Sequence, residues 1–189
     1  MNQELRDLFV ADQAEPRGNI AFDTPDYWQL RKRDAQRRQR VSELLAQGEV
    51  SAPDDYFHAA LIFQHGETLD DIWQAHELAR QAAELGATQS MGSKDSRWLA
   101  AAALDRWLMY QGKPQKYGTQ FVPDGKRWRL WDVDLGTSDA ERTANHVPAL
   151  QEQFKQAERY TQDGGFGIEK DKAPQWLRQA LERWEREDS

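Results

Sequence analysis

The sequence predicts a mainly α-helical fold with one small β-hairpin, and three observations support this. Apolar residues recur at helical spacing along most of the chain, as in the stripe that runs from Ile72 to Ala83. The period changes to a strand-like alternation over residues 120–131. A Pro-Asp-Gly turn at 123–125 sits inside that stretch, which is typical of a hairpin. We therefore expect a compact helical array of about six or seven helices.

The first half of the chain divides into helices at recognisable capping residues. Leu5, Leu8 and Phe9 form a short amphipathic segment that ends near Asp12. Thr24 and Pro25 have the residue types of an N-cap and a first helical position, so a long helix is expected from there to Gly48. Further helices are expected over residues 53–66, 68–86 and 95–110. These three are rich in alanine and end at glycine, which makes them tetratricopeptide-like, although one and a half units do not establish a repeat.

The second half combines the hairpin with further helices. The hairpin is expected near residues 119–133, and Ser138 with Glu141 forms a capping box for a sixth helix. Pro148 interrupts that helix, which resumes to about residue 160. Glycines over 163–167 predict a link to a last helix over 174–186, whose apolar stripe should dock on the body. We expect a helical domain over residues 1–162, then the link and docking helix over 163–189.

Composition narrows the class of protein. The chain has 189 residues, a net charge of −7 and no cysteine, so we expect one domain with no disulfide and no thiolate metal site. Eight Trp, five Tyr and seven Phe supply enough apolar surface for a folded core despite 30% charged residues. No long apolar stretch occurs, and the acidic balance disfavours nucleic-acid binding. A soluble cytoplasmic protein without membrane association is the expectation.

The loop from Gly112 to Gln120 reads Gly-Lys-Pro-Gln-Lys-Tyr-Gly-Thr-Gln. With this loop as its most specific motif, the chain resembles a widespread bacterial family of uncharacterised proteins over roughly residues 5–150. Two departures are the segment Gln47 to Val50, where many relatives have a Gly-Trp-Pro turn, and the segment after Pro148. The family implies a shared site and no established reaction. Its other signature residues here are Asp12, Gln13, Arg17, Gln64, His65, Asp105 and Arg106.

Asp105 and Arg106 lie in a helix that is apolar almost all round, so they are expected to be buried and paired. In a functional interpretation, Asp105 orients a histidine or acts as a general base, and Arg106 binds an anion. In a structural interpretation, the two form an internal ion pair that fastens the following loop to the helix. The sequence leaves both interpretations open.

His65 is the strongest histidine candidate because it ends a helix just before Gly66, where the helix dipole stabilises the charged imidazole. A simple C-terminal cap is the structural alternative. His58 lies two helical turns earlier, about 10 Å away, which is too far to share a metal ion. We therefore expect no metal site and no cofactor.

The loop after Asp105 offers donors and acceptors through Gln115, Tyr117, Thr119 and Gln120. It lacks the pattern of a phosphate-binding P-loop, so recognition of a small polar molecule or a peptide is the functional interpretation. A plug that satisfies buried helix ends is the structural one. The basic run over residues 31–40 is interpreted as a solvated helix paired with acidic residues, with phosphate or nucleic-acid contact as the alternative.

The leading functional hypothesis is an enzyme, a hydrolase or transferase, that acts on a small polar or anionic substrate by acid–base chemistry. His65, Asp105 and Arg106 are the expected catalytic residues. The alternative is a non-catalytic helical module that binds a protein partner, in which the same polar residues are structural. The expected substrate-binding residues are Asp12, Gln13, Arg17, Gln64, Gln115, Tyr117, Thr119 and Gln120.

Overall fold

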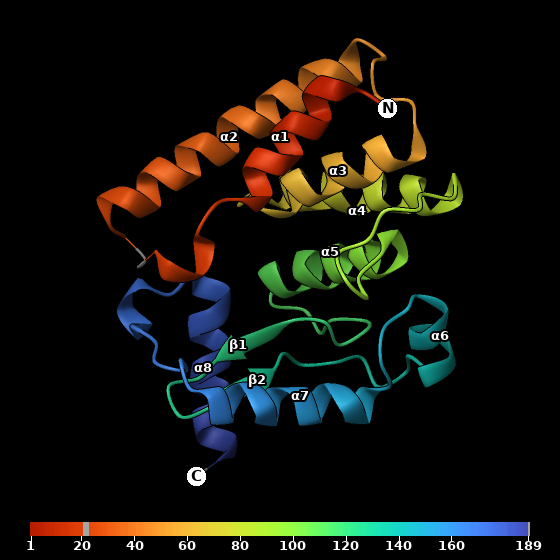
Figure 1. Cartoon of the computed structure of the whole chain (residues 1–189). Helices are drawn as coiled ribbons and strands as arrows, with labels where there is room; N and C mark the ends of the chain where they lie inside the picture. The colour runs from red at the N-terminus through yellow and green to blue at the C-terminus, as the bar shows by residue number, and fades with distance from the viewer. Residues whose placement is uncertain (21–22, 189) are drawn as a thin grey trace. The chain divides into compact units, whose positions relative to one another are not determined.

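The computed structural model describes residues 1–20 and 23–188, and Figure 1 shows the chain. Its fold is mainly α-helical, and the described residues form one small two-stranded antiparallel sheet, which confirms the predicted fold class. The chain divides into two compact units, Met1–Ala100 and Ala101–Ser189. The division falls inside a helix, where no change of composition marks it. The boundary that we predicted near residue 162 stays a prediction.

The first unit is built around its third helix. That helix, α3, packs against α1, α2 and α4 (Figure 1). Its residues from Phe57 to Gln64 are all buried, because neighbours cover it on several sides. Thr24 caps α2 by accepting a hydrogen bond from the backbone N–H of Tyr27, as its position before Pro25 predicts. The elements are α1 (Gln3–Gln13), η1 (Arg17–Asn19), α2 (Pro25–Ala46), α3 (Pro53–Gln64) and α4 (Leu69–Glu84).

The second unit begins within α5 and contains the hairpin. Its two strands pair in antiparallel register from Phe121 opposite Leu130 to Pro123 opposite Trp128, and α7 packs along the second strand (Figure 1). The broken sixth helix is present as two helices on either side of Pro148, because proline cannot supply a backbone donor there. The elements are α5 (Ser96–Tyr110), β1 (Phe121–Pro123), β2 (Trp128–Leu130), α6 (Asp139–Ala144), α7 (Leu150–Asp163), η2 (Lys170–Lys172) and α8 (Gln175–Glu187).

The last helix belongs to the core of the second unit. Leu177, Leu181 and Trp184 on α8 are buried together with Met109 and Trp131. The Trp131 and Trp184 rings meet edge to face, with their centroids 5.4 Å apart. The amphipathic stripe of this helix therefore packs on the hairpin side of the unit, as its spacing predicts. Along the described stretches of the chain, none of the helices combines the length and the apolarity that crossing a membrane requires.

Candidate functional site

In the first unit, four of the predicted site residues meet at one buried carboxylate. Asp12 lies in the last turn of α1 and is only 1% exposed. Its Oδ2 lies 2.9 Å from Nδ1 of His65, and the same oxygen accepts a hydrogen bond of 2.8 Å from the amide of Gln13. Its Oδ1 lies 2.7 Å from Nη2 of Arg17. Tertiary packing thus joins the start of the chain to the end of α3.

The position of His65 follows from the way α3 ends. His65 is the C-cap residue of α3, so its backbone carbonyl has no partner within the helix. Arg31 of α2 supplies one, because its Nη2 donates a hydrogen bond of 2.8 Å to that carbonyl. Arg31 thus holds the backbone of His65, while Asp12 contacts its imidazole. The side chain of His65 keeps 25% of its surface exposed.

Asp34 completes this cluster, and the sequence analysis did not single it out. Its side chain is fully buried and lies 2.7 Å from both Arg17 and Arg37. Burial acts to raise the pKa of Asp34, but the hydrogen bonds from Arg17 and Arg37 outweigh it and lower the pKa. The sequence carried a signal for this residue, since Asp34 is the only acid in the basic run over residues 31–40.

The basic run is largely neutralised within its own unit. Arg33 and Arg37 both pair with Glu15, at 2.8 and 2.9 Å, and Arg40 pairs with Glu4. The hydrogen bond from Arg33, helped by Arg37, lowers the pKa of Glu15 to about 2. These ion pairs agree with the interpretation of the run as a helix paired with acidic residues.

Gln64 and His58 lie elsewhere on α3. Gln64 is buried in its last turn, next to His65. His58 is also buried, and its ring stacks on Phe9 with the centroids 4.3 Å apart. Burial lowers the pKa of His58, although Asp55 acts in the opposite direction. His58 therefore belongs to the α1–α3 packing.

In the second unit, Asp105 organises the loop that follows α5. Its Oδ1 accepts hydrogen bonds from the backbone N–H groups of Lys116 and Tyr117, at 2.8 and 2.9 Å. Its Oδ2 accepts from the N–H groups of Gly118 and Thr119 and from the Thr119 hydroxyl, at 2.8–3.0 Å. Gly118 supports this wrapping with a φ of +94°, which favours glycine.

Backbone dipoles only partly offset the burial of the Asp105 carboxyl. The residue is 0% exposed, and burial raises its pKa, although the hydrogen bonds from Tyr117 and Thr119 act in the opposite direction. Four consecutive backbone N–H groups donate to this one carboxyl. The loop is thus fastened to α5 by its backbone and one hydroxyl, and the ion pair of Asp105 with Arg106 stays a prediction.

The glutamines of the loop are engaged inside the second unit. The Gln115 side chain is fully buried, and it donates to the carbonyls of Gln120 and Trp131 and accepts from the N–H of Gln120. The Gln120 amide donates to the Ala102 carbonyl and accepts a 3.3 Å hydrogen bond from Nε of Arg106. The structure therefore places Gln115, Thr119 and Gln120 in a buried network.

Tyr117 is the partly exposed one among the four binding residues predicted in the loop. Its backbone carbonyl accepts a hydrogen bond of 2.9 Å from Arg142, and the ammonium of Lys116 lies 5.4 Å from its ring centroid. The expected site residues thus form two groups, one around His65 and Asp12 and one around Asp105. The role of Asp105 in orienting His65 stays a prediction.

Comparison with known proteins adds no further assignment. The chain matches no protein-family model, no curated protein and no solved structure. The resemblance drawn from its motifs stays a prediction.

Proposed function

We propose that the protein is an enzyme that acts on a small polar or anionic substrate by acid–base chemistry centred on His65. The observation that carries this proposal is the pair formed by His65 and Asp12. A buried carboxylate lies 2.9 Å from Nδ1 of an imidazole that keeps 25% of its side-chain surface exposed. A histidine held in this way has one nitrogen fixed by the protein and the other available for a reacting group.

Asp12 would set the tautomer of His65. A carboxylate is an acceptor, so Nδ1 carries the proton and Nε2 keeps its lone pair. The described residues form no hydrogen bond to that Nε2. In the proposed reaction, Nε2 removes a proton from a water molecule or a substrate hydroxyl and later returns it to the leaving group. The adjacent Asp12 stabilises the imidazolium that forms in between.

Arg17 supports the anionic character of the proposed substrate. It binds Asp12 and Asp34 at the same time, and a quarter of its side chain is exposed. Arg31 adds a second guanidinium beside the His65 carbonyl. Arg31 also pairs with Asp34 and Glu67, so both guanidinium groups already have carboxylate partners. In the proposal, a phosphate or carboxylate group of the substrate would contact the exposed part of Arg17. In this proposal Asp12 takes the orienting role that the sequence suggested for Asp105.

The experiment compares His65→Asn with His146→Asn, the same substitution at an exposed histidine in the second unit. Each protein is incubated with 4-nitrophenyl acetate, 4-nitrophenyl phosphate and a cell metabolite extract, and consumption is followed by absorbance and mass spectrometry. We expect His65→Asn to consume at least one compound about 100-fold more slowly than either His146→Asn or the unmodified protein does. Thermal unfolding checks that both variants are folded. If no consumed compound depends on His65, the proposal is wrong.

A second candidate is the non-catalytic interaction module, and the bonding of Asp105 favours it. Both oxygens of that buried carboxylate accept hydrogen bonds within the loop, which supports a structural role there. If the whole polar set is structural, the protein will consume nothing in the panel. It will instead retain a stoichiometric protein partner whose capture does not change in His65→Asn.

A further inference from the structure

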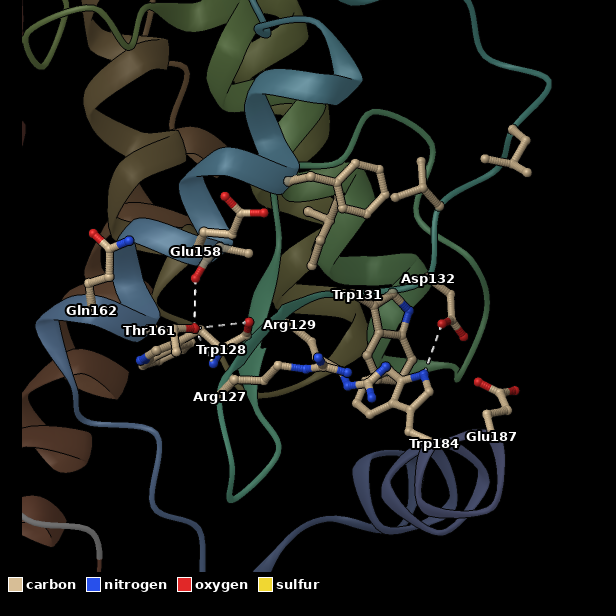
Figure 2. Close-up of a pocket in the computed structure, with 15 residues that line it drawn as sticks. Arg127, Trp128, Arg129, Trp131, Asp132, Glu158, Thr161, Gln162, Trp184 and Glu187 are labelled. Atoms are coloured by element: carbon tan, nitrogen blue, oxygen red, sulfur yellow. Dashed lines mark hydrogen bonds between the residues drawn. The ribbon is translucent and has the colours of Figure 1, made fainter. Parts of the chain in front are cut away.

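The second unit contains a pocket of about 700 Å³ that is independent of the His65 cluster. It lies between the second strand, α7 and α8, and Figure 2 shows its side chains. This volume is within the range of pockets that hold small molecules. The sequence analysis interpreted the tryptophans of this region as packing, and the proposed function does not use them.

The walls of the pocket are mainly apolar and aromatic. Leu130, Trp128 and Trp131 come from the strand and its continuation, and Trp184 comes from α8 (Figure 2). The indole N–H groups already have partners, since Trp128 donates to the Gly164 carbonyl and Trp184 to Asp132, at 2.9 and 3.1 Å. Trp131 and Trp184 are almost fully buried, so the indole surface open to a ligand is mainly that of Trp128.

Two side chains at this pocket are more exposed than an apolar group usually is. Leu135 is 82% exposed and Phe154 is 46% exposed, and both line the pocket. Covering them with an apolar ligand group would remove this surface from water, at a gain of roughly 25 cal/mol per Å². An apolar body is thus one requirement for the ligand.

The arginines of the lining are committed to other partners. Nε of Arg129 lies 2.7 Å from Asp124, and the Arg129 guanidinium also lies over the Trp184 ring at 5.2 Å. Arg127 pairs with Asp188 at 3.1 Å. Arg129 contacts Asp188 as well, so two arginines face two carboxylates here. These cations are neutralised and leave little positive charge for an anionic ligand.

The acids of the lining are less well neutralised. The described residues place no cation within ion-pairing distance of Glu158, whose side chain lies on α7 (Figure 2). Asp132 and Glu187 share one cation, Arg183, which lies 3.9 Å from Glu187 and forms a shorter contact with Asp132. The charge left at the pocket is therefore negative. The accessible rings beside it are those of Trp128 and Phe154, whose π-faces attract cations.

We infer that this pocket binds a small organic cation, an amine with an apolar or aromatic body. The body would lie against Trp128, Phe154 and Leu135, and the ammonium group would face Glu158 or the Asp132–Glu187 pair. This inference concerns binding only and does not depend on the chemistry proposed for His65.

Three probes that share a phenyl ring and a short chain test it: phenethylamine, 2-phenylethanol and 3-phenylpropionate. They are a cation, a neutral molecule and an anion, and their binding to the full chain is measured by calorimetry and by tryptophan fluorescence. We expect phenethylamine to bind most tightly of the three. Its binding should weaken as salt is added, because added ions screen the carboxylates. Binding of the anion as tightly as the amine, or no binding of the amine at millimolar concentration, would overturn the inference.

The control variant is matched in chemistry and in helix. Glu158→Gln removes the carboxylate of the pocket, and Glu152→Gln removes a carboxylate of the same helix that does not line it. Glu158→Gln should weaken the binding of phenethylamine by about two- to fivefold and leave the binding of 2-phenylethanol unchanged. Glu152→Gln should change neither. Phe154→Ala should weaken the binding of all three probes. Equal effects of Glu158→Gln and Glu152→Gln on the binding of phenethylamine would contradict the proposed site.

Discussion

Oδ2 of Asp12 lies 2.9 Å from Nδ1 of His65, although 53 residues separate the two along the chain. The carboxylate is buried, whereas the imidazole is partly exposed. Two arginines contact Oδ1 of the same carboxylate, Arg17 at 2.7 Å and Arg37 at 3.5 Å. This arrangement holds the imidazole in place, and it is the centre of the proposed function.

Asp12→Asn should destabilise the protein by about 3 kcal/mol, because it leaves the buried Arg37 and the partly exposed Arg17 beside a neutral amide. The free energy of unfolding is measured with denaturant. Asp7→Asn, an exposed position on the same helix, is the control and should stay within about 0.5 kcal/mol of the unmodified protein. Nitrogen NMR of His65 in the unmodified protein should show the proton on Nδ1. If Asp12→Asn lowers the free energy of unfolding no more than Asp7→Asn does, the ion pairs of Asp12 do not stabilise the protein.

Asp105→Asn should cost about 3 kcal/mol or more of unfolding free energy. An asparagine has one amide N–H₂ in place of an oxygen, so donors of the loop would face a donor and lose their partner. Denaturant unfolding measures this cost, with the exposed Asp163→Asn of the same unit as the control. Unchanged stability would show that the loop does not depend on the carboxylate charge, and it would favour a pocket at Asp105.

Gly66→Ala should destabilise the protein by about 1–3 kcal/mol through overpacking. A Cβ atom at Gly66 would come within 2.2 Å of the Cβ of Asp71, too close for the chain to accept without moving. The residue directly follows His65, so the variant should also disturb the imidazole. Gly18→Ala is the control, because a Cβ at that position meets no other atom within 4 Å. Equal melting temperatures for the two variants would contradict this close approach.

The ion pairs of Glu15 should make stability depend on pH. The pKa of Glu15 is lowered from 4.5 to about 2, so its stabilisation is fully present above pH 4.5 and is lost as pH falls towards 2. At pH 7, Glu15→Gln should be less stable than the unmodified protein by about 1–2 kcal/mol, a value reduced for solvent screening. That difference should shrink between pH 4.5 and pH 3. A difference that does not change over this range would show that the charge of Glu15 contributes nothing.

The elements of the fold were largely predictable because their signals are local. Thr24 before Pro25, and Ser138 three residues before Glu141, cap the helices that they were expected to begin. The hairpin followed from the Pro-Asp-Gly turn, although each strand is only three residues long. Helix boundaries depend on nearby backbone donors and turn residues, and these can be read within a few positions.

The candidate site was less predictable, and Asp34 shows why. Its partners Arg31 and Arg37 are close in sequence, but Arg17 and the buried surroundings come from another element. Asp12 was expected near a substrate, whereas its contact with His65 required α1 to pack on α3. Periodicity assigns a face to a residue and does not name its partner on another helix.

By itself, the sequence determined which segments are helical, where they are capped, and that charged residues lie inside apolar stretches. Only the tertiary structure decided what those charges do. Asp105 binds the backbone of its own loop, and Asp12 contacts His65, because an isolated charge cannot stay buried and takes whichever donors the packing brings within reach. Those donors are set by helix packing and loop geometry, which depend on contacts between residues far apart in the chain.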